Sequence, residues 1–201
     1  MSAPGQSRGG RPAVLSREKI IAAALAVIDA DGLEALSMRK VGERLGVEAM
    51  SLYRHVPNKA AMLAAVVDHL AAQAAVRLPA ATAWTDALLD FGHHYRQVLL
   101  AHPAAVPLLA THPVSPEVGA QLLGQILATV DLGETSLEDV QLAFQSVAVF
   151  TLGHALAQVG TPPGRREAPQ QADAGYYDTW FETGLSALHR GFMAAHPTRH
   201  G

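Results

Sequence analysis

The sequence predicts an all-α protein in which a short N-terminal helix-turn-helix region precedes a larger helical body. Three observations support this fold class. First, 49% of the 201 residues are hydrophobic but only 5% are Phe, Trp or Tyr, and alanine and leucine, which favour helices, dominate. Second, apolar residues recur at helical spacing over long segments. Third, serine, asparagine, proline and glycine stand where such segments begin and end.

The first expected helix begins after Ser16, a typical N-cap residue, and ends at Gly32. Its apolar side chains cover a broad inward face, so we expect it to support the helices that follow. Residues 1–15 before it are polar, glycine-rich and basic. We expect this segment to be a flexible basic arm that carries Arg8 and Arg11.

A helix-turn-helix pattern occupies residues 36–56. Ser37 stands as an N-cap, and Val41 with Leu45 forms a one-sided apolar stripe. Gly46 ends this first helix, because glycine adopts the left-handed conformation without a Cβ penalty. In such a unit the first helix crosses the DNA backbone and the second lies in the major groove. The pattern therefore indicates DNA binding.

The second helix of this unit has an inner and an outer side. Leu52 and Val56 lie four residues apart, so both face the core. The outer side carries Ala49, Met50, Ser51, Tyr53, Arg54 and His55. Small, polar and basic side chains of these kinds reach base edges and phosphate oxygens. We expect them to form the DNA-reading surface.

The body is predicted to contain further helices, separated by clear breaks. Asn58 is an N-cap signal, and Ser115-Pro116-Glu117 has the cap, first-turn proline and acid in the order that favours a helix start. Prolines break residues 103–113 into short pieces, and the Pro-, Gly- and Gln-rich segment 160–175 is predicted to be a loop. The expected body helices are Lys59–Val76, Trp84–Ala101, Ser115–Gly133, Ser136–Val159 and Tyr176–Ala195.

Charge is distributed unevenly along the chain. The net charge is −3, but residues 1–60 contain nine Lys and Arg against six Asp and Glu, so the remainder is acidic. A locally basic module can still displace counterions from DNA. We divide the chain into a basic arm at 1–15, a helix-turn-helix DNA-binding domain at 16–62, and a larger helical domain at 63–201.

Composition also restricts the compartment. Cysteine is absent, which excludes disulfides and thiolate metal sites. The N-terminus lacks the apolar stretch of a signal peptide, and no apolar run is expected to be long enough to span a bilayer. We therefore expect a cytoplasmic protein that has no membrane partner.

Two motifs carry a family resemblance. The segment from Leu36 to Glu48 leads into Ser51-Leu52-Tyr53-Arg54-His55-Val56-Pro57-Asn58-Lys59, whose Leu-Tyr-x-His-Val-x-Asn-Lys pattern is highly specific. This resembles the tetracycline-repressor (TetR) family of one-component bacterial regulators. Residues 84–102 and Phe150-Thr151-Leu152-Gly153 resemble its tetracycline-repressor-like C-terminal branch. The resemblance implies a homodimeric repressor that binds palindromic operator DNA and is released by a small apolar effector.

The same resemblance implies roles for particular residues. Arg39 matches a position that contacts DNA from the first helix. Base-facing positions fall on Ala49, Met50 and Ser51, and phosphate contacts fall on Tyr53, His55 and Lys59. Ala49 and Met50 depart from the best-known members of the family, so the operator sequence cannot be transferred.

The resemblance also argues against a tetracycline sensor. The positions that hold magnesium in that branch fall on Leu108 or Leu109 and on Ala157, and a drug-contacting His falls on Ala74. We therefore expect no metal and no other cofactor. An apolar pocket between the long helices, with a few polar groups, is expected instead. The candidate effector-binding residues are His69, Phe91, His94, Tyr95, His102, Thr111 and Gln145.

A two-fold homodimer is expected to place four helices at its interface. The apolar stretch Leu142–Leu156 contributes one helix of each subunit, and the closing helix contributes Trp180, Leu185, Leu188 and Phe192.

Other functions are weighed against this one. Ten histidines suggest a metalloenzyme, but the adjacent His93 and His94 point to different helix faces, and no His-x-x-x-His on one helix and no paired acid in ligand spacing accompany them. The sequence therefore predicts that the protein is not an enzyme. A transcriptional activator and a DNA-inactive helical interaction module remain alternatives to the repressor.

Overall fold

The structure is built mainly of helices, which confirms the predicted all-α class. A computed structural model describes residues 15–75, 82–160 and 173–195. The arm predicted at 1–15 and the loop predicted at 160–175 therefore lie almost wholly outside the described residues. The helices are α1 (Arg17–Asp31), α2 (Met38–Leu45), α3 (Ala49–Leu52), α4 (Lys59–Gln73), α5 (Trp84–Ala101), α6 (Val106–Thr111), α7 (Pro116–Leu127), α8 (Leu137–Val159) and α9 (Ala174–Ala195).

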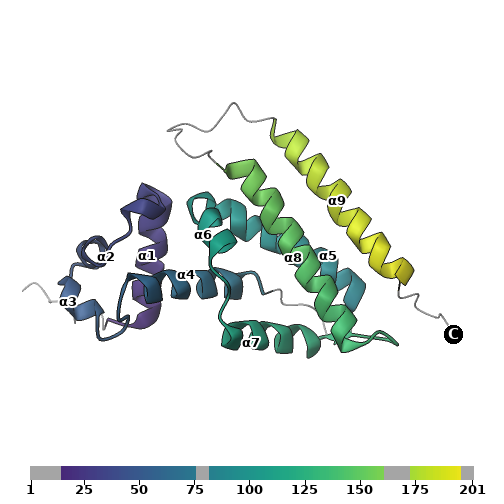
Figure 1. Cartoon of the computed structure of the whole chain (residues 1–201), viewed down its shortest axis with the longest axis horizontal. Coiled ribbons are helices and arrows are strands. Elements are labelled where there is room, and N and C mark those ends of the chain that lie inside the picture. Colours follow the sequence, from purple (N-terminus) through teal and green to yellow (C-terminus); the bar gives the residue numbers. More distant parts are fainter. Residues whose placement is uncertain (1–14, 76–81, 161–172, 196–201) are drawn as a thin grey trace, which may run out of the picture.

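The helices form two groups that α4 joins. Figure 1 shows α1, α2 and α3 together at one end, α5 to α9 in the body, and α4 running from the first group into the second. Short 3₁₀ turns at Leu33–Ala35 and Pro103–Ala105 lead from α1 towards α2 and from α5 into α6. Two parallel strands, β1 (Thr82–Ala83) and β2 (Val130–Asp131), bring the start of α5 beside the chain that follows α7.

Helix starts follow the predicted caps, because capping is a local interaction. Each cap side chain accepts the backbone N–H three residues further along, and the caps are Ser16, Ser37, Asn58, Ser115 and Ser136. Two of the longer helices end before the predicted residue. The fourth helix ends at Gln73, before the expected Val76. The seventh ends at Leu127 and not near Gly133, because β2 follows it and pairs with β1.

Two apolar clusters hold these helices together. The first contains Ile20 of α1, Leu70 of α4 and Leu108 of α6, so it extends from the N-terminal group into the body. The second lies between α5, α8 and α9, with Trp84 and Phe181 buried in it. The N-terminal group is therefore packed against the body through side chains that exclude water.

Helix α8 corrects one expectation from the sequence. By length and composition it is the one helix among the described residues that could cross a membrane, with a mean hydropathy of 1.4 in its 18-residue window. That window is 39% buried, because α8 packs against α5, α6 and α9. Its apolar character thus suits a central helix of the body. The expectation that no apolar run has such a length was wrong.

Helix α9 corrects a second expectation. Leu185 was expected at a subunit interface, but its side chain is 1% exposed and packs in the cluster between α5, α8 and α9. A Cβ added at Gly92 of α5 would lie 2.8 Å from Leu185 Cδ1. Leu185 therefore holds α9 against its own subunit and does not face a partner.

A buried histidine lies where α8 and α9 meet. The His154 ring is 4.9 Å from the Trp180 ring and 5.3 Å from that of Phe181, measured between centroids. Neither of its nitrogens has a hydrogen-bond partner among the described residues. Burial lowers the pKa of His154 and Arg96 on α5 lowers it further, whereas the Tyr177 backbone and then Asp178, both on α9, act in the opposite direction. The neutral ring is therefore the form that fits the folded structure.

The lowered pKa of His154 predicts a pH-dependent stability. The neutral His154 ring contributes fully to the free energy of unfolding above the ordinary histidine pKa of about 6.5. This contribution is lost as the pH falls through the lower pKa that His154 has in the folded protein. We expect the free energy of unfolding to decrease on acidification below about pH 6.5, and His154→Phe to flatten that decrease. Urea unfolding between pH 8 and 5 measures the free energy of unfolding at each pH. His112→Gln is the control, and its free energy of unfolding should change with pH as that of the wild type does. A His154→Phe slope equal to wild type would contradict this account.

Candidate nucleic-acid interface

Helix α2 is fixed by its buried face and by a contact with α1. Met38 and Val41 are buried against α1, and the Ser37 hydroxyl accepts the Lys40 N–H at 3.2 Å. Lys40 Nζ lies 2.9 Å from Asp31 Oδ2 at the end of α1. These contacts orient the first helix of the predicted helix-turn-helix.

The turn after α2 depends on two glycines. Gly46 has φ 68°, the left-handed conformation that the sequence predicted. Gly42 accepts the Val47 N–H through its carbonyl at 3.0 Å, so the turn folds back over it. A Cβ at Gly42 would lie 2.8 Å from the Val47 carbonyl oxygen and 3.2 Å from the Ala49 nitrogen. Gly42 is thus needed for the close approach of α2 and α3, which the sequence analysis did not identify.

Helix α3 is shorter than the pattern indicated. It ends at Leu52, and residues 53–55 continue as a hydrogen-bonded turn, with the His55 N–H donating to the Leu52 carbonyl at 2.9 Å. The residue before a proline disfavours helical backbone, so Pro57 prevents further extension. Leu52 and Val56 are 0% and 1% exposed, which confirms that they face the core.

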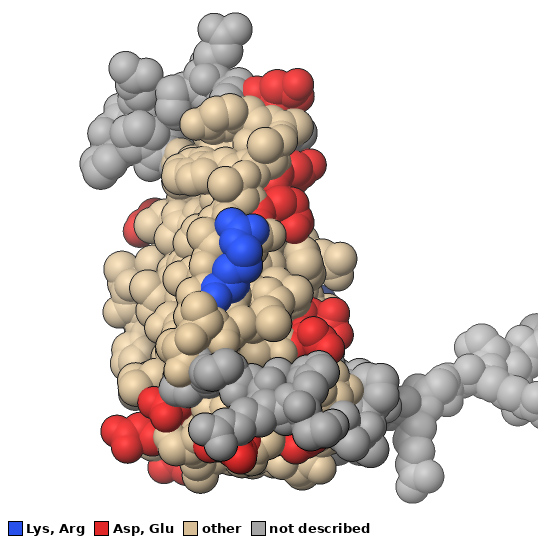
Figure 2. Space-filling view, turned by 90° about the vertical axis from the view of Figure 1, so that its right-hand side faces the viewer, with Lys and Arg blue, Asp and Glu red and all other residues tan. Residues whose placement is uncertain are grey.

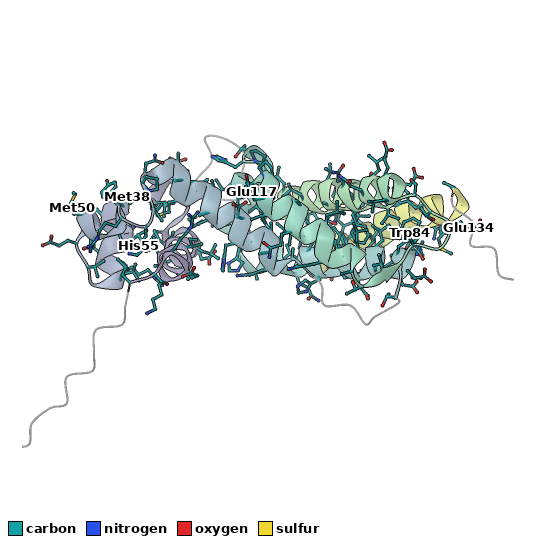
Figure 3. The ribbon with its side chains drawn as sticks, turned by 90° about the horizontal axis from the view of Figure 1, so that it is seen from below. Met38, Met50, His55, Trp84, Glu117 and Glu134 are labelled. Atoms are coloured by element: carbon teal, nitrogen blue, oxygen red, sulfur yellow. The ribbon has the colours of Figure 1, made fainter. Side chains whose placement is uncertain are left out.

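The predicted DNA-reading side chains lie around α3 at the end of the molecule that is remote from the body. Met50 projects from this end, where Figure 3 labels it, and is 73% exposed. Tyr53 is 44% exposed, and Arg54 beside it is also exposed. The remaining members, Ala49, Ser51 and His55, are half-buried. Side chains of different lengths therefore lie together around α3 at this end of the molecule.

Basic residues flank this surface on both sides. Arg39 on α2 has an 84% exposed side chain and lies 3.5 Å from Glu43, an exposed pair that contributes little to stability. Lys59 is exposed at the first position of α4.

The pKa of Glu18 on α1 is lowered by hydrogen bonds from its own backbone and Ser16, with smaller contributions from nearby charges that include His55.

A second candidate site is a cavity in the body. It has a volume of about 520 Å³ and lies between α5, α7 and α8. Two predicted effector residues, Phe91 and Gln145, line it. The rest of the wall is mainly apolar, with Gly119, Ala120 and Leu123 from α7 and Phe144 from α8. A small apolar molecule matches such a lining.

The structure places the other five predicted effector residues outside this cavity's lining. Tyr95 is buried, which raises the pKa of its hydroxyl to about 12. The Thr111 hydroxyl donates to the Pro107 carbonyl at 2.9 Å in its own helix. His102 Nδ1 lies 2.9 Å from Asp29 Oδ2, so it links α5 to α1.

The last two candidates lie near the end of α4. His94 Nε2 donates to the Gln73 carbonyl at 2.9 Å and thereby joins α5 to the last turn of α4. His69 Nε2 and Gln73 Nε2 are 2.8 Å apart. Burial lowers the pKa of His69, and His102 adds a smaller effect in the same direction. His94 thus takes part in a contact between helices, whereas the hydrogen bond of His69 lies within α4.

No group of three or more His, Cys, Asp or Glu that could hold a metal ion occurs within residues 15–75, 82–160 and 173–195. At the positions implied by the family resemblance, Leu108 and Leu109 are buried in the apolar core. A magnesium–drug chelate therefore has no ligand at these two positions.

Comparison with known proteins establishes the class to which this arrangement belongs. The family described as "Bacterial regulatory proteins, tetR family" matches residues 20–66, which contain the helix-turn-helix. The family described as "Tetracyclin repressor-like, C-terminal domain" matches residues 78–183. The chain belongs to the tetR family of bacterial regulators. Such regulators are generally DNA-binding proteins without enzymatic activity.

Two curated relatives extend the match. The Tetracycline repressor protein class D of Escherichia coli is 33% identical over 196 residues, which cover 89% of each chain. An HTH-type transcriptional regulator of Saccharopolyspora erythraea is 30% identical over 145 residues. That match covers 72% of this chain and 61% of the relative, so this chain matches less than two thirds of its length.

Solved structures share the whole fold. The Streptomyces coelicolor TetR family protein ActR, in complex with (S)-DNPA, has a TM-score of 0.71 at 25% identity, covering 91% of this chain and 99% of ActR. BioQ with its double-stranded DNA operator has a TM-score of 0.62 at 27% identity, covering 90% and 99%. Among similar structures are therefore one with a bound small molecule and one with bound DNA.

The close approach at Gly42 predicts that a single methyl group disrupts the turn. We expect Gly42→Ala to lower the free energy of unfolding by about 2 kcal/mol, because the new Cβ meets backbone atoms that cannot rotate away. Gly124→Ala is the matched control. Its Cβ would meet nothing within 4 Å, and it should stabilise α7 by about 0.5–1 kcal/mol. Urea denaturation measures the change in the free energy of unfolding for both variants. Equal changes would contradict the close backbone approach at Gly42.

Proposed function

We propose that this protein is a ligand-responsive transcriptional repressor, which binds palindromic operator DNA as a homodimer and is released by a small apolar effector. The observation that carries the proposal is the exposed surface around α3. Its core-facing side is anchored by the buried Leu52 and Val56, while Met50 and Tyr53 are exposed beyond it. A rigidly held, exposed reading helix is what the major groove accepts.

The chemistry of this surface suits two kinds of DNA contact. Met50 and Ala49 can contact a thymine methyl group, and Arg39 can donate two hydrogen bonds to guanine. Ser51, Tyr53, His55 and Lys59 offer donors to phosphate oxygens, which fix position without reading sequence. The match to BioQ, whose structure contains its operator, supports this use of the surface.

A second copy of the chain is the partner that the outer face of α8 and α9 fits. On α8, Leu142 and Val149 are 52% and 72% exposed, and on α9 Trp180 is 45% exposed. Half-buried Leu188 and Phe192 line shallow apolar grooves beside them. Figure 2 shows this side of the molecule as largely uncharged apart from a basic side chain near its middle, with acidic residues towards its edges. Apolar surface of this kind marks an interface between subunits.

Dimerisation also explains how a short helix can be selective. Two α3 surfaces related by a two-fold axis bind two half-sites one DNA turn apart, about 34–36 Å, so both contribute to one binding event. We propose the division into residues 1–15, 16–62 and 63–201 on this basis, with α4 crossing from the DNA-binding to the dimerising part. Cytoplasmic location and the absence of catalytic activity complete the proposal.

The effector is proposed to enter the cavity between α5, α7 and α8. Phe91 supplies an aromatic wall and Gln145 a polar group that can orient a ligand. Occupancy favours a conformer in which α4 turns and the two α3 surfaces no longer match successive major grooves. The ligand named in the ActR structure supports a small-molecule role for the body of this fold.

The phosphate contacts predict a specific change in salt dependence. DNA selected from a random pool by wild-type protein provides the duplex, and affinity is then measured from 50 to 300 mM salt. We expect Lys59→Ala to reduce the slope of log K against log salt by about 2, because a dimer loses two phosphate contacts. Arg190→Ala, an exposed residue on α9, is the control. A Lys59→Ala slope equal to that of wild type would remove Lys59 from the interface.

The proposed interface predicts the effect of one buried charge. We expect Val149→Asp to convert the dimer to a monomer at micromolar concentration, because the carboxylate would be desolvated at the interface without a partner. Met50→Asp is the matched control, since Met50 is 73% exposed at the opposite end and should leave the dimer intact. Light scattering measures both masses. A dimeric Val149→Asp protein would show that the subunits meet elsewhere.

A further inference from the structure

A hydrogen bond joins α4 to the start of α7. Asp68 Oδ1 of α4 accepts the backbone N–H of Ser115 at 2.8 Å. Ser115 is the N-cap of α7, and its hydroxyl accepts the Val118 N–H at 3.4 Å. The Asp68 carboxylate therefore faces the positive end of the α7 dipole and makes a charge-assisted bond there. The two helices are held together at one defined point.

The same helix α7 forms a wall of the cavity. Pro116, Gly119, Ala120 and Leu123 all line it. No residue of α7 is fully buried, so the helix can shift without exposing much apolar surface. A molecule that fills the cavity therefore meets a wall of low local stability, and this wall is attached to α4 through Asp68.

A second contact makes α4 a lever. His94 Nε2 of α5 donates to the Gln73 carbonyl at 2.9 Å, which holds the C-terminal end of α4 to the body. Along the helix axis Asp68 lies about 7.5 Å from Gln73, and Lys59 lies about 21 Å from it. If Gln73 acts as the pivot, a displacement at Asp68 becomes almost three times larger at Lys59, beside the DNA-reading surface.

We propose that Asp68 is the positioning residue that couples occupancy of the cavity to the orientation of α4. This inference rests on the proposed function. Displacement of α7 is transmitted through the Asp68–Ser115 bond and turns α4 about its Gln73 end. A ligand that moves α7 then changes DNA affinity without touching α4.

A double-mutant cycle tests this without a known effector. Gly119→Trp fills the cavity from α7, because a Cβ at Gly119 meets nothing within 4 Å. The probe is the duplex that wild-type protein selects from random DNA. We expect Gly119→Trp to weaken binding at least tenfold in the wild-type background and less than twofold in Asp68→Ala. Asp68→Asn, which keeps the Oδ1 acceptor, should retain most of the loss.

The outcomes separate this coupling from the proposed function. An equal loss in the Asp68→Ala and wild-type backgrounds, or no loss in wild type, overturns the role of Asp68 while DNA binding stands. If Gly119→Trp fails to fold, judged by circular dichroism, Ala120→Phe fills the same cavity and takes its place. Wild-type protein that selects no duplex contradicts the proposed function itself, and the coupling falls with it.

Discussion

The orientation of the DNA-reading surface depends on one apolar core that α4 shares with both ends of the molecule. Met62, Val66 and Leu70 of α4 are each no more than 1% exposed, and they belong to a cluster that extends from α1 into α5, α6 and α8. The His102–Asp29 contact adds a polar link between α5 and α1. Because α1 packs closely against α4 within this cluster, the N-terminal helices follow α4 when it turns. The fold thereby connects the cavity in the body to the surface around α3.

The two sides of α8 differ in burial, and we assign one to packing within the subunit and the other to association. Val140 and Val147 are fully buried within the subunit, whereas Val149 is 72% exposed. The inner side, with the aromatic rings around His154, attaches α9 to the body. The outer side carries the exposed apolar surface on which we propose that a second subunit packs. This division explains why the sequence of α8 is apolar on nearly all sides although only part of it is buried in one chain.

The sequence predicted what local chemistry decides. Interactions within four residues determine caps such as Ser37 and Asn58 and the left-handed conformation of Gly46. The position of the helix-turn-helix and its core-facing residues could therefore be predicted. Contacts between distant segments were not. Gly42 is required only because Val47 and Ala49 fold back over it, and Leu185 is buried only because α5 lies beneath it. His94 and His102 looked like ligand groups, but each forms a contact from α5 or its C-cap to another helix. The cavity combines three helices, and no motif marks it.

The central claim is that two DNA-reading surfaces, each carried by α4, are held one helical turn apart in a dimer. The chain has no cysteine, so Glu48→Cys introduces one spin-label site at the exposed N-cap of α3. Electron paramagnetic resonance then measures the distance between the two labels on the selected duplex. The account predicts a narrow distribution centred at about 30–40 Å, consistent with half-sites one turn apart. A protein that shows no dipolar coupling on that duplex, or a distance far outside this range, would contradict it.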